Sequence, residues 1–118
     1  MVNYIPEQGD IVYIKFSGTI GHEQFGNRPA LVISNKVFND FMKMAIVCPF
    51  TNNNKNYPYH FPISDKYKTK GVVMLEQLKT IDYNAREIRF IERIDDNDIK
   101  IFSSTIKTFM DIVEFDKF

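Results

Sequence analysis

The sequence has few cysteines, no tryptophan and no long apolar run. Its single cysteine, Cys48, has no cysteine partner for an internal disulfide or a zinc site, so we predict an inert core residue in a reducing compartment. No apolar run reaches the ~18 residues that a membrane helix needs, and the first ten residues contain no signal-peptide core. We therefore expect a cytoplasmic protein with no membrane partner.

Motifs for phosphate-loop, metal and thiol chemistry are also missing. The sequence has no G-x-x-x-x-G-K-[ST] loop, no H-E-x-x-H, and no cluster of histidine, cysteine and carboxylates at metal-ligand spacing. Glu76 and Asp82 are too isolated to predict a two-metal nuclease. We expect no metal ion and no cofactor.

Net charge is zero, but the charge is unevenly distributed. Residues 1–91 carry 11 Lys and Arg against 8 Asp and Glu, whereas residues 92–118 carry 4 against 7. The positive excess in the first part permits nucleic-acid binding without establishing it, because ordinary solvated surfaces explain it equally well.

Short strands with turn-like stretches between them fill most of the chain, and 118 residues fit a single domain spanning 1–118. Apolar, β-branched and aromatic runs predict strands at residues 10–16, 29–34, 44–50, 59–63 and 72–75. Residues 17–27 hold three of the five glycines and are predicted to form a loop. This spacing predicts a small, strongly curved antiparallel sheet or barrel.

The C-terminal segment has a helical period instead. Six apolar residues recur there at intervals of three and four: Ile99, Phe102, Ile106, Phe109, Met110 and Val113. Asp95, Asp96 and Asp98 precede them and suit the N-cap and the positive end of a helix dipole, so we assign this acidic cluster no catalytic role. The predicted fold class is mainly β (α+β), a barrel-like sheet followed by a C-terminal helix.

Two polar residues flank the central apolar strands. Arg28 directly precedes the run PALVIS, and Thr51 directly follows MAIVCPF. If these strands are antiparallel neighbours, the start of one meets the end of the other, and Arg28 and Thr51 lie together at one rim of the sheet.

Four sequence blocks carry a family resemblance. GDIVYIKF, GHEQFGNRPALVIS (Gly21–Ser34), PFTNNNK (Pro49–Lys55) and VVMLEQLKTID (Val72–Asp82) resemble, in order and spacing, the signature blocks of the MazF/PemK toxins. The resemblance covers nearly the whole chain. It implies an SH3-like antiparallel β-barrel with a C-terminal α-helix and a homodimer. It also implies the toxin of a type II toxin–antitoxin system, a sequence-specific endoribonuclease that cleaves single-stranded RNA, usually mRNA, without a metal ion.

The resemblance also implies roles for individual residues. Arg28 and Thr51 match the family's catalytic pair, and Glu23 its loop glutamate. The expected substrate-binding residues, where related toxins line the RNA groove, are Gln24, Asn35, Asn53, Lys55, His60, Gln77 and Lys79. Asn27 and the run Asn52–Asn54 occupy variable family positions, so we expect them to set which bases are read. A cognate antitoxin is implied as well, with a disordered tail that blocks the groove.

Metal-free RNA cleavage uses the ribose 2′-hydroxyl as nucleophile and leaves a 2′,3′-cyclic phosphate and a 5′-hydroxyl. Arg28 offers a planar fork of donors that matches a phosphate, and Thr51 offers a neutral hydroxyl. Arginine holds its proton tightly and is therefore a poor acid or base. Glu23 is therefore our hypothesised base, with His60 as a second candidate.

Two other functions remain open from the sequence. One is a non-enzymatic toxin on a related barrel that poisons DNA gyrase, as CcdB-like proteins do, because fold alone does not decide function. The other is an SH3-like module that binds proline-rich peptides through Tyr57, Tyr59 and Phe61. The Arg28–Thr51 pair favours the ribonuclease over the gyrase-poisoning toxin, and the Glu-Gln-x-Gly-x-Arg loop, which a binding module does not need, favours it over the peptide-binding module.

Overall fold

The computed structural model describes residues 4–15, 27–53 and 57–113. The elements in chain order are β1 (Asp10–Lys15), β2 (Asn27–Val32), α1 (Lys36–Met42), β3 (Ala45–Thr51), β4 (His60–Pro62), β5 (Val72–Met74), η1 (Leu75–Gln77), β6 (Lys79–Ile81), β7 (Ile88–Arg93), α2 (Asp96–Phe109) and η2 (Met110–Ile112).

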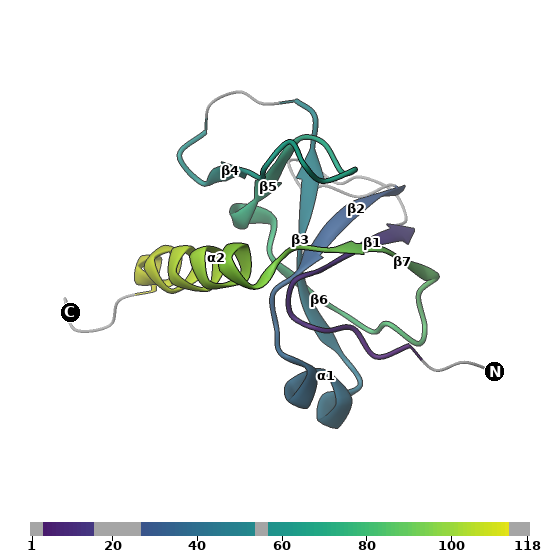
Figure 1. Cartoon of the computed structure of the whole chain (residues 1–118). Helices are drawn as coiled ribbons and strands as arrows, with labels where there is room; N and C mark the ends of the chain where they lie inside the picture. The colour runs from purple at the N-terminus through teal and green to yellow at the C-terminus, as the bar shows by residue number, and fades with distance from the viewer. Residues whose placement is uncertain (1–3, 16–26, 54–56, 114–118) are drawn as a thin grey trace.

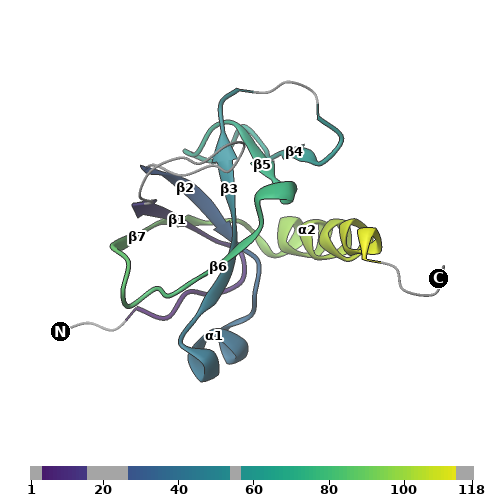
Figure 2. The ribbon, with the colours of Figure 1, turned by 180° about the vertical axis from the view of Figure 1, so that it is seen from behind.

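The strands form one antiparallel, bent sheet in the order β4-β5-β3-β2-β1-β7, with β6 paired to β3 off this path. β3 is the corner strand. On one edge it pairs with β2, and on the other its first half pairs with β6 while its last residues pair with β5. Figure 1 shows α2 projecting to one side of the sheet, with α1 at the end opposite to β4 and β5. The view from behind in Figure 2 gives the same arrangement.

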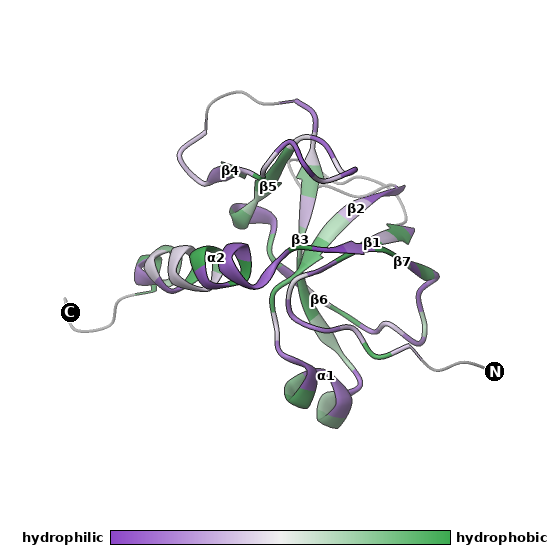
Figure 3. Ribbon diagram, viewed as in Figure 1, coloured by the Kyte–Doolittle hydropathy of each residue, from purple (hydrophilic) through white to green (hydrophobic). Residues whose placement is uncertain are grey.

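Both faces of the central strands are buried, which explains their continuous apolar runs. Neighbouring residues alternate between two core clusters: Ile11 and Leu31 belong to one, Val12 and Val32 to the other. The first cluster also contains Phe102 of α2, so the helix covers that face. Figure 3 shows apolar residues where β2 and β3 cross the middle of the sheet and polar residues at the upper end of β2.

The predicted C-terminal helix is confirmed, including its start. The carboxylate of Asp95 accepts a 2.8 Å hydrogen bond from the backbone N–H of Asp98, which makes Asp95 the N-cap. The predicted apolar face is too long, however. α2 ends at Phe109, and Met110 and Val113 lie beyond it with 44% and 50% of their surface exposed.

The five predicted strands are confirmed to within two residues at each end. Most of the predicted loop at 17–27 lies outside the described residues, and its last residue, Asn27, instead begins β2. Five elements were not predicted: α1, β6, β7 and the short 3-10 helices η1 and η2. α1 is held through its polar residues, since Asn35 caps it and Asn39 is fully buried and bonded to the backbone of Pro6 and Ser34.

Candidate active site

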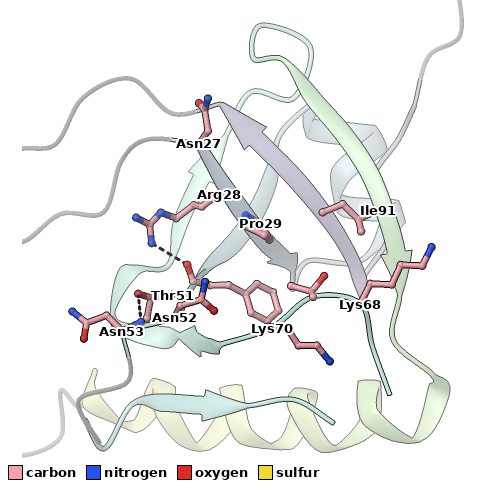
Figure 4. Close-up of a pocket in the computed structure, with 11 residues that line it drawn as sticks. Asn27, Arg28, Pro29, Thr51, Asn52, Asn53, Lys68, Lys70 and Ile91 are labelled. Carbon is pink, nitrogen blue, oxygen red and sulfur yellow. Dashed lines mark hydrogen bonds between the residues drawn. The ribbon is translucent and has the colours of Figure 1, made fainter. Parts of the chain in front are cut away.

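Arg28 and Thr51 lie at the same end of two paired strands. β2 and β3 place Ala30 opposite Pro49, and this register carried two residues further sets Arg28 opposite Thr51. The Nη1 of Arg28 donates a 3.0 Å hydrogen bond to the carbonyl oxygen of Phe50, the residue before Thr51. The expected juxtaposition is therefore present, at the rim drawn in Figure 4.

The bond to Phe50 orients the Arg28 guanidinium along the rim of the sheet. The Nε of Arg28 is buried and has no hydrogen-bond partner among the described residues. A guanidinium carries five N–H donors in a fixed fork, so one bond to the backbone fixes its orientation and leaves others for a ligand. A half-satisfied arginine of this kind is suited to bind an anion such as a phosphate.

Thr51 is held by the residues that follow it on one side and by the start of β5 on the other. Its Oγ1 accepts a 3.1 Å hydrogen bond from the backbone N–H of Asn53. On the β5 side, Gly71 has φ +103°, and a Cβ there would lie 2.4 Å from the carbonyl oxygen of Thr51. Only glycine fits this close approach, so Gly71 is a site residue that the sequence reasoning missed. Its position directly before the Val72–Met74 strand was the available signal.

An open pocket of about 580 Å³ extends from this rim. It is lined by Asn27, Arg28, Pro29, Phe50, Thr51, Asn52, Asn53, Lys68, Thr69, Lys70 and Ile91. Three of these described lining residues are basic and none is acidic. Figure 4 shows Arg28 and Thr51 on one wall and Lys68 and Lys70 toward the other. The pocket therefore offers cations at both ends and hydroxyl and amide groups between them, a composition suited to a nucleic-acid strand.

The second wall is tied to β7 by Glu92. Its carboxylate accepts hydrogen bonds from the backbone N–H groups of Lys68 (3.1 Å) and Thr69 (2.8 Å) and from the Thr69 hydroxyl (2.8 Å). Burial alone would raise the pKa of Glu92, but these three bonds and the charge of Lys68 outweigh it and hold the pKa below its ordinary value. Sequence reasoning did not find this wall.

His60 does not line the pocket. It lies in β4 with 4% of its side chain exposed, and its Nε2 is 2.8 Å from a carboxylate oxygen of Glu76. Its Nδ1 is buried and has no hydrogen-bond partner among the described residues. The ring of Tyr57 lies 4.9 Å from the imidazole, centroid to centroid. His60 is therefore an ordered, largely enclosed histidine outside the Arg28–Thr51 pocket.

The remaining predicted site residues are scattered. Asn53 lines the pocket. Asn35 caps α1 by accepting a 2.9 Å bond from Phe38 N–H, at the end of the sheet away from the pocket. Gln77 ends η1 and Lys79 begins β6. Glu23, Gln24 and Lys55 lie outside the described residues.

Cys48 is a fully buried core residue, as predicted. Burial, reinforced by the charge of Glu76, raises the pKa of its thiol to about 12. Among the described residues, no three His, Cys, Asp or Glu side chains gather in a group that would hold a metal ion. Within residues 4–15, 27–53 and 57–113, neither helix is long and apolar enough to cross a membrane.

Comparison with known families and curated proteins gives a consistent result. A family model described as the PemK-like, MazF-like toxin of type II toxin–antitoxin systems matches residues 7–110. The endoribonuclease toxin MazF of Escherichia coli K12 is 36% identical over 83 residues, which cover 70% of this chain and 74% of that protein. Endoribonuclease EndoA of Bacillus subtilis is 31% identical over 116 residues, covering 94% and 99%.

Solved structures share the fold. MazF from Deinococcus radiodurans superposes with a TM-score of 0.80 and 26% identity, covering 92% of this chain and 98% of that one. A MazE–MazF complex from the same organism matches with a TM-score of 0.75 and 23% identity, covering 92% and 97%. The described β-sheet and C-terminal helix are thus the fold of these proteins.

Proposed function

The chain belongs to the PemK-like, MazF-like toxin family of type II toxin–antitoxin systems and is an endoribonuclease toxin, and we propose that it cleaves single-stranded RNA at the Arg28–Thr51 rim without a metal ion. The observation that carries the proposal is the pairing of β2 with β3, which joins Arg28 to the backbone beside Thr51 in a pocket with basic walls. The gyrase-poisoning and peptide-binding alternatives are not favoured, since the curated relatives are named endoribonucleases.

In the proposed reaction the ribose 2′-hydroxyl attacks the adjacent phosphorus. A 2′,3′-cyclic phosphate forms, and the 5′-oxygen of the next nucleotide leaves as a hydroxyl. Negative charge grows on the non-bridging oxygens, where the free donors of Arg28 would stabilise it. The Oγ1 of Thr51 already accepts a bond from Asn53 N–H, so its own hydrogen is directed elsewhere and is available to a phosphate oxygen.

The 2′-hydroxyl loses a proton and the departing 5′-oxygen gains one, so the reaction needs a proton-transfer group besides Arg28 and Thr51. A guanidinium holds its protons tightly, so Arg28 acts in this proposal through its charge and its donors. Glu23 is the proposed base that takes the proton of the 2′-hydroxyl, and water supplies the proton that the departing 5′-oxygen gains. Both ends of the segment that contains Glu23 lie at the pocket's rim, because Lys15 at the end of β1 pairs with Asn27 at the start of β2. His60 is less suitable, since its Nε2 is engaged by Glu76 and it lies outside the pocket.

Base selection is assigned to the amides of the pocket. Asn27, Asn52 and Asn53 line it beside Arg28 and Thr51, and each amide offers both donors and an acceptor to the edge of an unpaired base. Gln24, Gln77 and Lys79 are proposed to extend the groove. The cleaved motif should therefore change when these asparagines are exchanged, while the chemical nature of the ends stays the same.

Cleavage of a long mixed-sequence RNA in excess EDTA tests the reaction. We expect the wild-type protein to cut at one short motif and to leave cyclic-phosphate ends, and Arg28→Ala to abolish cutting. Arg89→Ala is the matched control, because Arg89 is an exposed arginine that packs over the ring of Tyr13, outside the pocket. A folded wild-type protein that cuts nothing, or an Arg28→Ala variant that cuts at the normal rate, would overturn the proposal.

A cognate antitoxin is the natural partner of a type II toxin. We propose that its disordered C-terminal tail folds across the pocket and places acidic and apolar side chains where RNA would lie, which keeps the toxin inactive in the cytoplasm. The basic walls formed by Arg28, Lys68 and Lys70 suit an acidic tail as well as RNA. Competition between antitoxin and a non-cleavable RNA is the test, and simultaneous binding of both would contradict the proposal.

The protein is also proposed to act as a homodimer. A second hollow, of about 630 Å³, lies between α2 and the segment that includes β4, lined partly by Tyr59, Phe61, Phe109 and Ile112. Ile112 is 58% exposed and Tyr59 43% exposed, so this side retains an apolar surface that a second copy would cover. Sedimentation at micromolar concentration should show a dimer, and a purely monomeric protein would count against it.

A further inference from the structure

The segment between β4 and β5 brings basic residues to the pocket wall that faces Arg28. Lys68 and Lys70 both line the pocket, and Thr69 between them is 7% exposed. The ammonium of Lys70 donates to the carbonyl oxygens of Asp65 and Tyr67, each at 3.1 Å, so its position is fixed by its own segment. Both lysines therefore belong to the pocket lining, and the ammonium of Lys70 is held against its own segment.

Two anchors hold this backbone. At one end, the Tyr67 hydroxyl donates a 2.5 Å bond to Asp98 and accepts a 2.8 Å bond from Asp95 N–H, which ties the segment to the start of α2. One residue further on, Glu92 accepts the N–H groups of Lys68 and Thr69. The segment is thus clamped between the helix and β7.

A bulge in β7 explains why Glu92 and Ile91 both reach this wall. Ile11 pairs with Glu92 and Val12 with Phe90, so Ile91 is an extra residue without a partner in the β1–β7 ladder. Bulges re-aim side chains and are frequent beside functional sites. Here Ile91 lines the pocket while the next residue, Glu92, bonds the lysine-bearing segment.

The electrostatics of this wall favour an anion. The carboxylate of Glu92 is satisfied by two backbone N–H groups and the Thr69 hydroxyl, while the described residues that line the pocket include no acid. The clamp therefore holds Lys68 and Lys70 in the lining of the same pocket that Arg28 lines. Single-stranded nucleic acid follows basic grooves of this kind through its phosphates.

We propose that Lys68 and Lys70 form a second phosphate-binding subsite, which holds a backbone phosphate next to the scissile one, and that Glu92 is the positioning residue of this subsite. The inference rests on the proposed ribonuclease function and adds to it the path of the RNA across the pocket. The subsite supplies binding that is equal in the ground and transition states, whereas Arg28 supplies transition-state stabilisation.

The test uses the full-length protein and a short RNA that contains the mapped cleavage motif. The Lys68→Gln/Lys70→Gln double variant should raise KM about 10-fold or more at moderate salt and leave kcat within about 2-fold. With a non-cleavable RNA carrying a 2′-deoxy nucleotide at the scissile position, the slope of log Kd against log salt should fall by about 0.7 for each phosphate that the variant no longer neutralises. Lys100→Gln/Lys107→Gln, which removes two exposed lysines of α2 outside the pocket, is the charge-matched control and should change neither quantity.

Substitution of single phosphates in the RNA by uncharged methylphosphonates locates the subsite. One flanking position should weaken binding to the wild-type protein but leave binding to the double variant unchanged.

If wild type cuts RNA but the double variant keeps its KM and salt slope, the subsite is refuted while the ribonuclease function stands. If the double variant loses only antitoxin binding, the surface serves the antitoxin and the RNA subsite is likewise refuted. A wild-type protein that neither binds nor cuts RNA refutes both the subsite and the ribonuclease function.

The sign of the effect at Glu92 separates positioning from simple charge. Glu92→Gln removes a negative charge beside the subsite, which by electrostatics alone would strengthen RNA binding. The amide cannot accept all three of the existing bonds, so loss of the clamp should instead raise KM several-fold, with kcat retained and the salt slope reduced. Glu92→Asp, which keeps the charge and can accept the same donors, should recover part of the lost affinity. Tighter binding by Glu92→Gln would overturn the positioning role.

Discussion

The two walls of the pocket are built in different ways. The Arg28–Thr51 wall is set by a β-ladder, in which backbone pairing alone brings residues 23 positions apart to one rim. The Lys68–Lys70 wall is a segment without strand pairing, held by the side chains of Glu92 and Tyr67. One wall thus depends on register and the other on a few hydrogen bonds between side chains and backbone.

This difference determines how each wall should respond to change. A ladder keeps its register unless a whole strand slips, so variants on the first wall should act through the chemistry of the replaced group. A clamp fails when a single acceptor is lost, because the backbone N–H groups it satisfies have no alternative in the sheet. The first wall is suited to catalysis, which demands precise geometry, and the second to binding.

The largest expected effect comes from exchanging the type of cation on each wall, lysine for Arg28 on the first and arginine for Lys68 on the second. Arg28→Lys should lower kcat by about 10²–10³, because a single ammonium cannot bond Phe50 and also offer a fork to the phosphate. Lys68→Arg should stay within about 3-fold of wild type, because a phosphate bound as a point charge accepts either cation. Single-turnover cleavage of one oligonucleotide measures both, and equal losses at the two positions would remove the distinction between the walls.

The sequence allowed the first wall to be predicted and not the second, for physical reasons. Two apolar strand runs already indicate a ladder and its rim, because Arg28 directly precedes one run and Thr51 directly follows the other. Glu92 lies in a β7 strand whose residues alternate poorly in burial, and its partners Lys68 and Thr69 are more than 20 positions away. A side-chain clamp between an irregular segment and a bulge has no local pattern, so only the structure shows it. α1, held by the buried Asn39, was missed for a related reason.

A smaller effect is expected where the walls meet at Gly71. Gly71 has φ +103°, and the Cβ of an alanine there would lie 2.4 Å from the Thr51 carbonyl oxygen. Gly71→Ala should therefore destabilise the fold by about 1–3 kcal/mol and also displace Thr51. We expect a lower Tm together with a kcat at least 10-fold lower, measured on protein verified as folded by circular dichroism.

Gly9 is the matched control for Gly71. It has φ +96°, and an added Cβ would meet the side chain of Ile99 at 2.6 Å, on the α2 side of the sheet and away from the pocket. Gly9→Ala should therefore lower the Tm while leaving the kcat of the folded protein unchanged. If both alanines reduced kcat equally, loss of activity would reflect general strain rather than displacement of Thr51.

The clamp should also appear in the pH dependence of stability. The pKa of Glu92 lies below its ordinary value of 4.5, so its stabilising contribution is complete above about pH 4.5 and is lost as the pH falls through the lower folded value. Glu92→Gln lacks this contribution. The Tm difference between wild type and Glu92→Gln should thus be constant near neutral pH and should narrow below pH 4.5. A difference that is the same at pH 3 as at pH 7 would show that the carboxylate charge adds nothing to the clamp.

The smallest expected effect concerns Cys48, which lies on β3 three residues before Thr51, in the core behind the first wall. With a pKa of about 12, on the order of 10⁻⁴ of the thiol is ionised at pH 8, and burial blocks access of reagents as well. Iodoacetamide should leave the native protein unlabelled and fully active, and should label it once in urea. Labelling of the native protein with parallel loss of cleavage would mean that β3 opens at the pocket. The ladder wall would then be no more rigid than the clamped one.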